Sequence, residues 1–118
     1  MKTSSSEGKM ILKFDEMETK ELPAFYGGEG IFFAKMFVDE NNKILRGKLV
    51  PGASIGVHRH EPTSEIIFVV SGKGKMLCDG KEECLLPGDC HYCPKGSEHT
   101  FVNDGDEDIH FFAVVPKH

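Results

Sequence analysis

The chain has 118 residues and a formal net charge of −5, and its apolar runs are all far shorter than a membrane span. Its basic residues are spread along the sequence rather than gathered in one stripe, which argues against nucleic acid as a partner. The N-terminus lacks the apolar core of a secretory signal, so a cytoplasmic location is expected. This length predicts one domain.

The first part of the chain carries weak structural signals. Residues 1–9 contain almost nothing to bury and are predicted to form a disordered tail, with a single domain at residues 10–118. Residues 10–14 could form a short first strand. Residues 15–22 are charged and form either a turn of helix or a loop that ends at Pro23.

From Gly30 onward, short apolar segments alternate with turn signals such as Asp79 followed by Gly80. No long segment has the 3.6-residue period of a helix. The pattern predicts an all-β sandwich or barrel. The expected strands are residues 31–38, 44–50, 54–60, 65–70, 73–78, 81–85, 90–93, 99–103 and 108–115.

One motif in this pattern has the form G-x5-H-x-H-x4-E-x6-G and contains His58, His60 and Glu65. Side chains alternate along a strand, so His58 and His60 share one face. The turn former Pro62 allows a hairpin that places Glu65 opposite the two imidazoles. The three side chains can therefore converge on one ion.

A second motif has the form G-x5-P-x-G-x2-H-x3-N and contains His99 and Asn103. His99 begins a strand after a turn at Pro94 and Gly96, and it reaches the first motif only if the sheet folds over. Three imidazoles and a carboxylate suit one divalent transition metal per chain: iron, manganese, nickel, copper or zinc. Four protein ligands on an octahedral ion leave open positions for water, dioxygen or substrate.

The two motifs resemble the paired motifs of the cupin superfamily, and the resemblance covers about residues 43–116. It implies a single antiparallel β-barrel or jelly roll, the double-stranded β-helix of that family. The family habit of forming dimers, together with the open edges of a small barrel, predicts a homodimer. The resemblance implies that the metal ligands are His58, His60, Glu65 and His99, that Gly52, Gly72, Gly88, Pro94 and Gly96 form turns, and that Asn103 closes the second motif without touching the metal.

Strand alternation also predicts which side chains line the pocket. Gly56 within a strand marks either a close approach of another backbone or a bulge. On the last strand either face could point inward; if His110 does, it becomes a candidate general acid or base. The predicted neighbours are Ser54 and Gly56 beside His58, Ile67 and Val69 beside Glu65, and Phe101 and Asn103 beside His99.

The other histidines and the cysteines are interpreted as structural. His91 and His110 fit neither motif and are interpreted as partly exposed strand residues. Cys90 and Cys93 form a C-x-x-C pair, but strand residues three apart face opposite ways, so joint chelation is geometrically poor. With Cys78 and Cys84, they are interpreted as small apolar fillers without disulfides.

Two functions agree with these features. The first is a metal-dependent enzyme that acts on a small organic substrate between apolar walls, and the family includes dioxygenases, isomerases, lyases and decarboxylases. A dioxygenase is preferred, because the interior lacks the arginine pair that sugar phosphates usually need. The alternative is a non-catalytic module that binds or senses a small molecule at a metal-centred pocket. A purely structural metal is disfavoured, because a barrel of this size has a core of its own.

Overall fold

The computed structural model describes residues 11–118, which form antiparallel strands and two short 3-10 helices. This arrangement confirms the predicted all-β class and its jelly roll of antiparallel strands. Both helices are single turns, too short to cross a membrane. In chain order the elements are η2 (Phe14–Glu16), β1 (Lys20–Pro23), η3 (Phe25–Gly27), β2 (Ile31–Val38), β3 (Asn42–Leu49), β4 (Ser54–Arg59), β5 (Glu65–Ser71), β6 (Gly74–Cys78), β7 (Lys81–Leu85), β8 (Cys90–Cys93), β9 (Glu98–Val102) and β10 (Ile109–Pro116).

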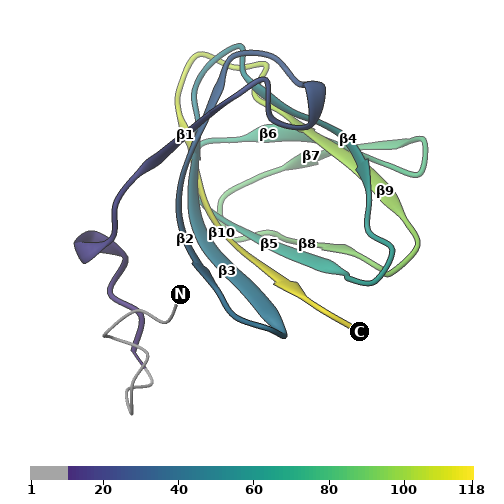
Figure 1. Cartoon of the computed structure of the whole chain (residues 1–118). Coiled ribbons are helices and arrows are strands. Elements are labelled where there is room, and N and C mark those ends of the chain that lie inside the picture. The colour runs from purple at the N-terminus through teal and green to yellow at the C-terminus, as the bar shows by residue number, and fades with distance from the viewer. Residues whose placement is uncertain (1–10) are drawn as a thin grey trace.

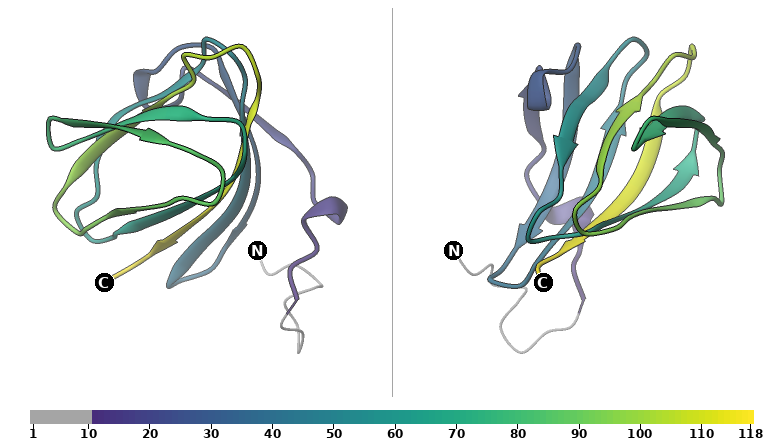
Figure 2. Two further views of the ribbon diagram at one scale, coloured as in Figure 1. Left: turned by 180° about the vertical axis from the view of Figure 1, so that it is seen from behind. Right: turned by 90° about the vertical axis from the view of Figure 1, so that its right-hand side faces the viewer.

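The strands form two sheets that face one another (Figure 1, Figure 2). One sheet has six strands in the order β1-β2-β3-β10-β5-β8, and the other has four in the order β4-β9-β6-β7. The chain crosses between sheets at each of the two motifs: β4 is followed by β5, and β8 by β9. These crossings bring the two motifs together across the interior.

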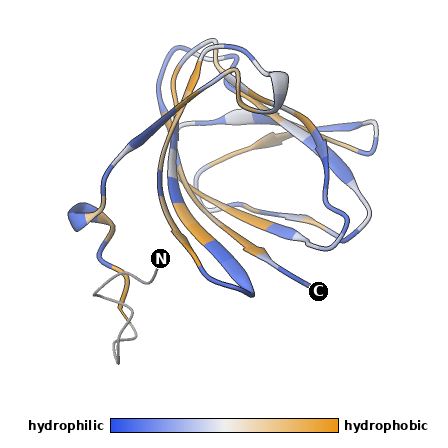
Figure 3. Cartoon of the chain, in the orientation of Figure 1, coloured by the Kyte–Doolittle hydropathy of each residue, from blue (hydrophilic) through white to orange (hydrophobic). Residues whose placement is uncertain are grey.

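The core lies between the sheets because alternate side chains of each strand point inward. On β5, Ile67 and Val69 are buried beside Glu65, as predicted, while Phe68 between them is exposed. Phe101 of β9 and Phe111 of β10 contact each other across the interior, with ring centroids 5.4 Å apart. Figure 3 shows hydrophobic residues along much of β5 and β10 and hydrophilic residues at the β2–β3 tip.

A β-bulge interrupts the alternation of β4. Ile55 pairs with Phe101 and His58 pairs with His99, so residues 56 and 57 of β4 face a single residue of β9. The extra residue reverses the inward and outward positions along β4. Ile55 and His58, three residues apart, therefore both line the interior.

The predicted placement of Ser54 and Gly56 beside His58 in the pocket is therefore wrong. Ser54 instead accepts a hydrogen bond at Oγ from the backbone N–H of Glu29, at 2.9 Å. Both interpretations of Gly56 are confirmed. Gly56 lies in the bulge, and a Cβ atom there would overlap the carbonyl oxygen of Tyr26 in η3.

The sequence-based assignment of the N-terminal region needs correction. Residues 11–13 have no regular structure and Phe14 begins η2, so the predicted strand at 10–14 is wrong over its described part. Met10 and the predicted tail at 1–9 lie outside the described residues. The turn of helix expected within 15–22 overlaps η2, but strand β1 was missed, because it lies at a sheet edge and its residues are mostly exposed.

The turn residues of both motifs lie where the resemblance places them. Gly52, Gly72, Gly88 and Gly96 all have left-handed backbone angles, with φ between 79° and 91°. Asn103 is fully buried at the end of β9, and its Nδ2 donates to the carbonyls of Leu49 and Glu107, each at 2.8 Å. These contacts fix the chain direction at the end of each motif strand.

Candidate metal centre

The structure brings the four predicted ligands together at one place in the interior. His58 comes from β4, His60 from the turn that follows, Glu65 from the start of β5, and His99 from β9. His60, Glu65 and His99 are buried, and His58 is partly buried. The donor atoms all lie within 4.8 Å of one another. His99 was expected to reach the first motif only if the sheet folds over. In the structure β9 pairs with β4, and this pairing sets His99 directly opposite His58.

The separations between donor atoms suit a metal ion. Nε2 of His99 lies 3.0 Å from Nε2 of His60, 3.1 Å from Nε2 of His58 and 2.9 Å from Oε1 of Glu65. His60 Nε2 is 3.0 Å from the same oxygen, and only His58 Nε2 is farther from it, at 3.7 Å. Adjacent ligands on an octahedral ion with bonds of about 2.1 Å are separated by about 3.0 Å. The cluster is therefore suitable for a metal ion.

The other ring nitrogens of the histidines are also occupied. His58 Nδ1 donates to the carbonyl of Gly56 at 2.9 Å, so the neutral ring presents a lone pair at Nε2. His60 Nδ1 lies 2.9 Å from Thr63 Oγ1. Such outer hydrogen bonds fix ring orientation and the tautomer that can bind a metal.

His91 supplies the outer contact of the third imidazole. Its Nε2 lies 3.0 Å from Nδ1 of His99, and its side chain is buried. The interpretation of His91 as a partly exposed strand residue is therefore wrong. Burial is the main cause that lowers the pKa of His91 to about 4, and the nearby His99 is the second. The ring is therefore neutral at pH 7. The alternation of β8 was the available signal, since His91 and Cys93 share its inner face.

Glu65 is ionised despite its burial. Burial alone would raise the pKa of this carboxyl, but the adjacent imidazoles of His58, His60 and His99 outweigh it and hold the pKa well below its usual value. The carboxylate is therefore available as an anionic donor at neutral pH.

A small cavity of about 30 Å³ adjoins the cluster. Aromatic side chains form much of its wall, which agrees with the apolar pocket that was predicted. Lys43 of β3 and Tyr26 of η3 also line it. Both residues line a wider vestibule of about 440 Å³ as well. Sequence reasoning missed both residues. The alternation of side chains could have indicated the inward position of Lys43, because Lys43 lies two residues before the buried Leu45 on β3.

Tyr26 lies over the entrance of the cluster. Its ring stacks on His58, with centroids 4.2 Å apart and planes 13° apart. Its backbone is left-handed, with φ of 52°, and so is that of Ala24, with φ of 49°. Such conformations are unfavourable for residues other than glycine and occur often at functional sites. Burial and the negative charge of Glu65 both raise the pKa of Tyr26, so the phenol keeps its proton.

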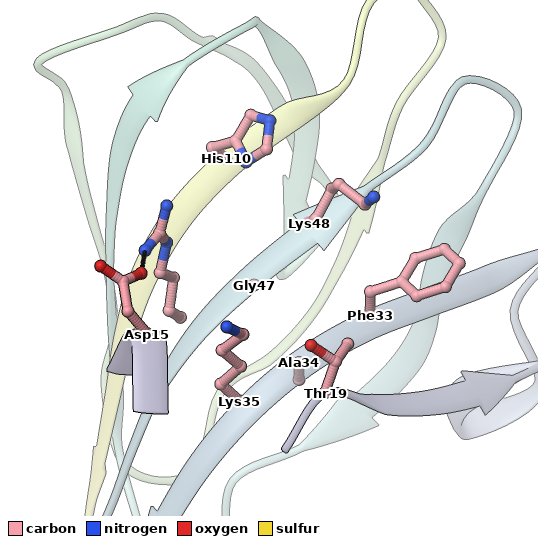
Figure 4. Close-up of a pocket in the computed structure, with 9 residues that line it drawn as sticks. Asp15, Thr19, Phe33, Ala34, Lys35, Gly47, Lys48 and His110 are labelled. Atoms are coloured by element: carbon pink, nitrogen blue, oxygen red, sulfur yellow. Dashed lines mark hydrogen bonds and ion pairs between the residues drawn. The ribbon is translucent and has the colours of Figure 1, made fainter. Parts of the chain in front are cut away.

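His110 does not lie near the cluster. Ile109, Phe111 and Ala113 are the buried residues of β10, and His110 points to the outer face of the six-stranded sheet. There it lines a hollow of about 190 Å³ together with Lys48 of β3 (Figure 4). His110 was a candidate general acid or base only if it pointed inward, so that role is not supported. The basic residues are also less scattered than the sequence indicated, because Lys35, Arg46 and Lys48 meet at this hollow.

The cysteines differ from one another in their surroundings. Cys90 and Cys93 face opposite sides of β8, as predicted, with Cys90 exposed and Cys93 buried. Cys84 is also exposed, so the interpretation of all four as apolar fillers is wrong for Cys84 and Cys90. All four thiols are free.

Comparison with known proteins agrees with this architecture. The family model of the cupin domain matches residues 45–115. An oxalate-binding protein of Thermotoga maritima is 31% identical over 112 residues, which cover 90% of this chain and 93% of that protein. The chain therefore belongs to the cupin family.

Solved structures share the fold. A "predicted oxalate decarboxylase" from Thermotoga maritima superposes with a TM-score of 0.87 and 27% identity, over 92% of this chain and all of that one. A cupin-superfamily sugar phosphate isomerase from Silicibacter pomeroyi superposes with a TM-score of 0.74 and 24% identity, over 92% of this chain and 76% of that one. The second similarity, at that identity, concerns the fold alone.

Proposed function

We propose that the chain binds one divalent transition metal through His58, His60, Glu65 and His99, and that this centre holds a small carboxylate of the oxalate class. The donor separations near 3.0 Å support the metal. Nitrogen donors favour iron, manganese, nickel, copper or zinc over calcium and magnesium. When bound, the metal supplies a Lewis-acidic site with open positions.

The observation that carries the choice of ligand is the lining of the cavity. Its volume of about 30 Å³ admits only a small molecule, and Lys43 is the cation that lines both the cavity and the vestibule. A short dianion needs a positive partner at each end, and Lys43 can pair with the carboxylate that faces the vestibule. The names of the Thermotoga maritima relatives, which refer to oxalate, point the same way.

The surrounding residues have separate tasks in this proposal. Tyr26 covers His58 at the mouth and keeps a phenolic proton that can be donated to an anionic ligand. Phe101 and Phe111 form the inner wall and exclude water, which strengthens the attraction between charges inside. Glu65 stays ionised and limits the net positive charge of the centre.

Titration calorimetry with oxalate tests the proposal. Protein loaded with Mn²⁺ is expected to bind oxalate, and chelated protein is not. Lys43→Gln is expected to weaken binding about tenfold through loss of one charge-assisted contact. Lys48→Gln is the matched control, because Lys48 lies on the same strand but points to the outer face. Equal affinity in the Lys43→Gln and Lys48→Gln proteins would contradict the role of Lys43, and equal binding without metal would contradict the centre.

Catalysis is a separate question from binding. The apolar wall around the cluster favours the metal-dependent enzyme of dioxygenase type that the sequence predicts, because such a wall shields reactive species from water. The alternative is a binding or sensing module. Dioxygen consumption and carbon dioxide release by iron-loaded and manganese-loaded protein, measured over a panel of small carboxylates, distinguish them. Ligand binding without turnover across this panel would favour the module.

We also propose that the chain forms a homodimer in the cytoplasm. The outer face of β5, β8 and β10 exposes a patch of apolar side chains, and such patches mark interaction sites. A second copy would cover this face by twofold symmetry. The free thiols agree with a reducing compartment. The patch consists of Ile66, Phe68, Val70, Tyr92 and Phe112.

A further inference from the structure

Beside the proposed centre lies a second group of potential ligands, formed by Cys78, His91 and Cys93. Their donor atoms all lie within 4.8 Å of one another. Cys78 ends β6 in the four-stranded sheet, and the other two lie on β8 in the six-stranded sheet. We propose that these three side chains form a second metal site, selective for a thiophilic ion of the zinc class.

The strand register places this group next to the first one. Cys78 is the β6 partner of His99, and Cys93 is the β8 partner of Glu65. Each cysteine is therefore one strand away from a proposed ligand of the first metal. Sequence reasoning considered only Cys90 with Cys93, whereas the fold pairs Cys93 with a cysteine of the opposite sheet.

The donor set decides which ion fits. Two sulfurs and one imidazole nitrogen match the ligands that Zn²⁺ takes, and three protein ligands leave one tetrahedral position open. Soft sulfur donors disfavour manganese and magnesium, which suit oxygen ligands. The two groups of ligands therefore differ in selectivity, with nitrogen and oxygen in the first and sulfur in the second.

An ion can reach the group from solvent. Cys78 and His91 line a cleft of about 610 Å³ between the β6–β7 hairpin and β8. Asp79, Glu83 and Asp89 line the same cleft and attract cations, opposed by a single lysine, Lys81. Cys93 is fully buried and forms the inner end of the group.

A redox role for the two thiols fits less well. Burial is the main cause that raises the pKa of Cys78, and it raises that of Cys93 to about 12. Both are therefore protonated at neutral pH, and protonated thiols are poor nucleophiles. A metal ion binds such groups by displacing their protons.

His91 links the two groups. Its Nε2 lies 3.0 Å from Nδ1 of His99. When His99 presents the lone pair of its Nε2 to the first cluster, its proton is on Nδ1, and Nε2 of His91 accepts a hydrogen bond from it. His91 is then held in one tautomer and is less free to bind a second ion. The second site is therefore tested most directly with the first one disabled, by His58→Ala together with His60→Ala.

The experiment measures zinc and cobalt in that double variant under reducing conditions. Equilibrium dialysis is expected to give about one tightly held Zn²⁺ per chain, and Co²⁺ is expected to show sulfur-to-cobalt charge-transfer absorption. Adding Cys78→Ser and Cys93→Ser is expected to weaken zinc binding at least a hundredfold and remove this absorption. The matched control is Cys84→Ser with Cys90→Ser, because these thiols line the same cleft outside the group.

Equal zinc affinity in the two cysteine variants would overturn the proposal, as would charge-transfer absorption that depends on Cys84 or Cys90. Alkylation of the wild-type protein gives a second measurement that does not depend on a variant folding. Cys78 is expected to react without zinc and to be protected with it, whereas the exposed Cys84 and Cys90 react in both cases. Unchanged reactivity of Cys78, or a Cys78–Cys93 disulfide in place of the bound ion, would also overturn the proposal. Because the first cluster is disabled in the dialysis test, a failure there leaves the proposed function standing.

Discussion

His91 and His99 are joined through their rings, with Nε2 of His91 3.0 Å from Nδ1 of His99. The opposite nitrogen of His99 faces His58 and His60. His91 is neutral at pH 7 and can accept the Nδ1 proton, which leaves the Nε2 lone pair of His99 directed at the cluster. A residue at a variable position of the second motif thus sets the tautomer of a proposed metal ligand.

Replacement of His91 should therefore weaken metal binding at the first cluster. His91→Leu removes the acceptor and is expected to lower Mn²⁺ affinity by roughly ten- to a hundredfold. His91→Gln keeps an acceptor oxygen and is expected to retain most of the affinity. Electron paramagnetic resonance of free Mn²⁺ measures both, and this ion avoids the sulfur donors nearby. Similar affinities for the Leu and Gln variants would contradict the positioning role.

The burial of His91 also predicts a pH dependence of stability. Its pKa is about 4 in the folded chain, below the usual 6.5, so the unfolded chain binds more protons between these values. The contribution of neutral His91 is complete above about pH 6.5 and is progressively lost as the pH falls through 4. Denaturant unfolding of chelated protein at pH 7 and pH 4.5 measures this loss. His91→Gln should show a smaller loss over the same range, and an identical loss would count against this assignment.

The sequence predicted the jelly roll well because its signals are local and repeated. Glycines that need left-handed angles, such as Gly52 and Gly88, mark the turns, and alternation identified Ile67 and Phe101 as inward residues. Alternation mispredicted the inward side chains of β4, because the bulge at Gly56 exchanges the inward and outward positions. The bulge is visible only in the pairing of β4 with β9.

The residues around the cluster were harder to predict, because tertiary contacts place them. Tyr26 reaches His58 from a 3-10 turn thirty-two residues earlier in the chain, and no local pattern indicates that contact. The Cys78–Cys93 proximity likewise arises between two different sheets. The position of Lys43 could have been predicted, since the alternation of side chains places it on the same face of β3 as the buried residues.

Gly56 tests how closely η3 is packed against β4. A Cβ atom at this position would overlap the backbone oxygen of Tyr26, so Gly56→Ala should displace η3 and the tyrosine with it. The expected cost is roughly 1–3 kcal/mol of unfolding free energy, as for other overpacked sites. Oxalate affinity of metal-loaded protein should fall as well. Gly105→Ala is the control, because a Cβ there meets only Asn103 Oδ1, at an ordinary 3.6 Å. Equal stability and affinity in the two variants would show that η3 accommodates the methyl group.

The apolar outer face of β5 predicts how the assembly can be broken. Phe68 is 45% exposed and pairs across the strands with Phe112, at the middle of the patch. Phe68→Lys should therefore place a charge in the dimer interface and give monomers by light scattering at concentrations where the wild type is dimeric. Val57→Lys is the matched control, because Val57 is 61% exposed but lies on β4 in the other sheet. A monomeric wild type would exclude the dimer, and dissociation by Val57→Lys alone would move the interface to the four-stranded sheet.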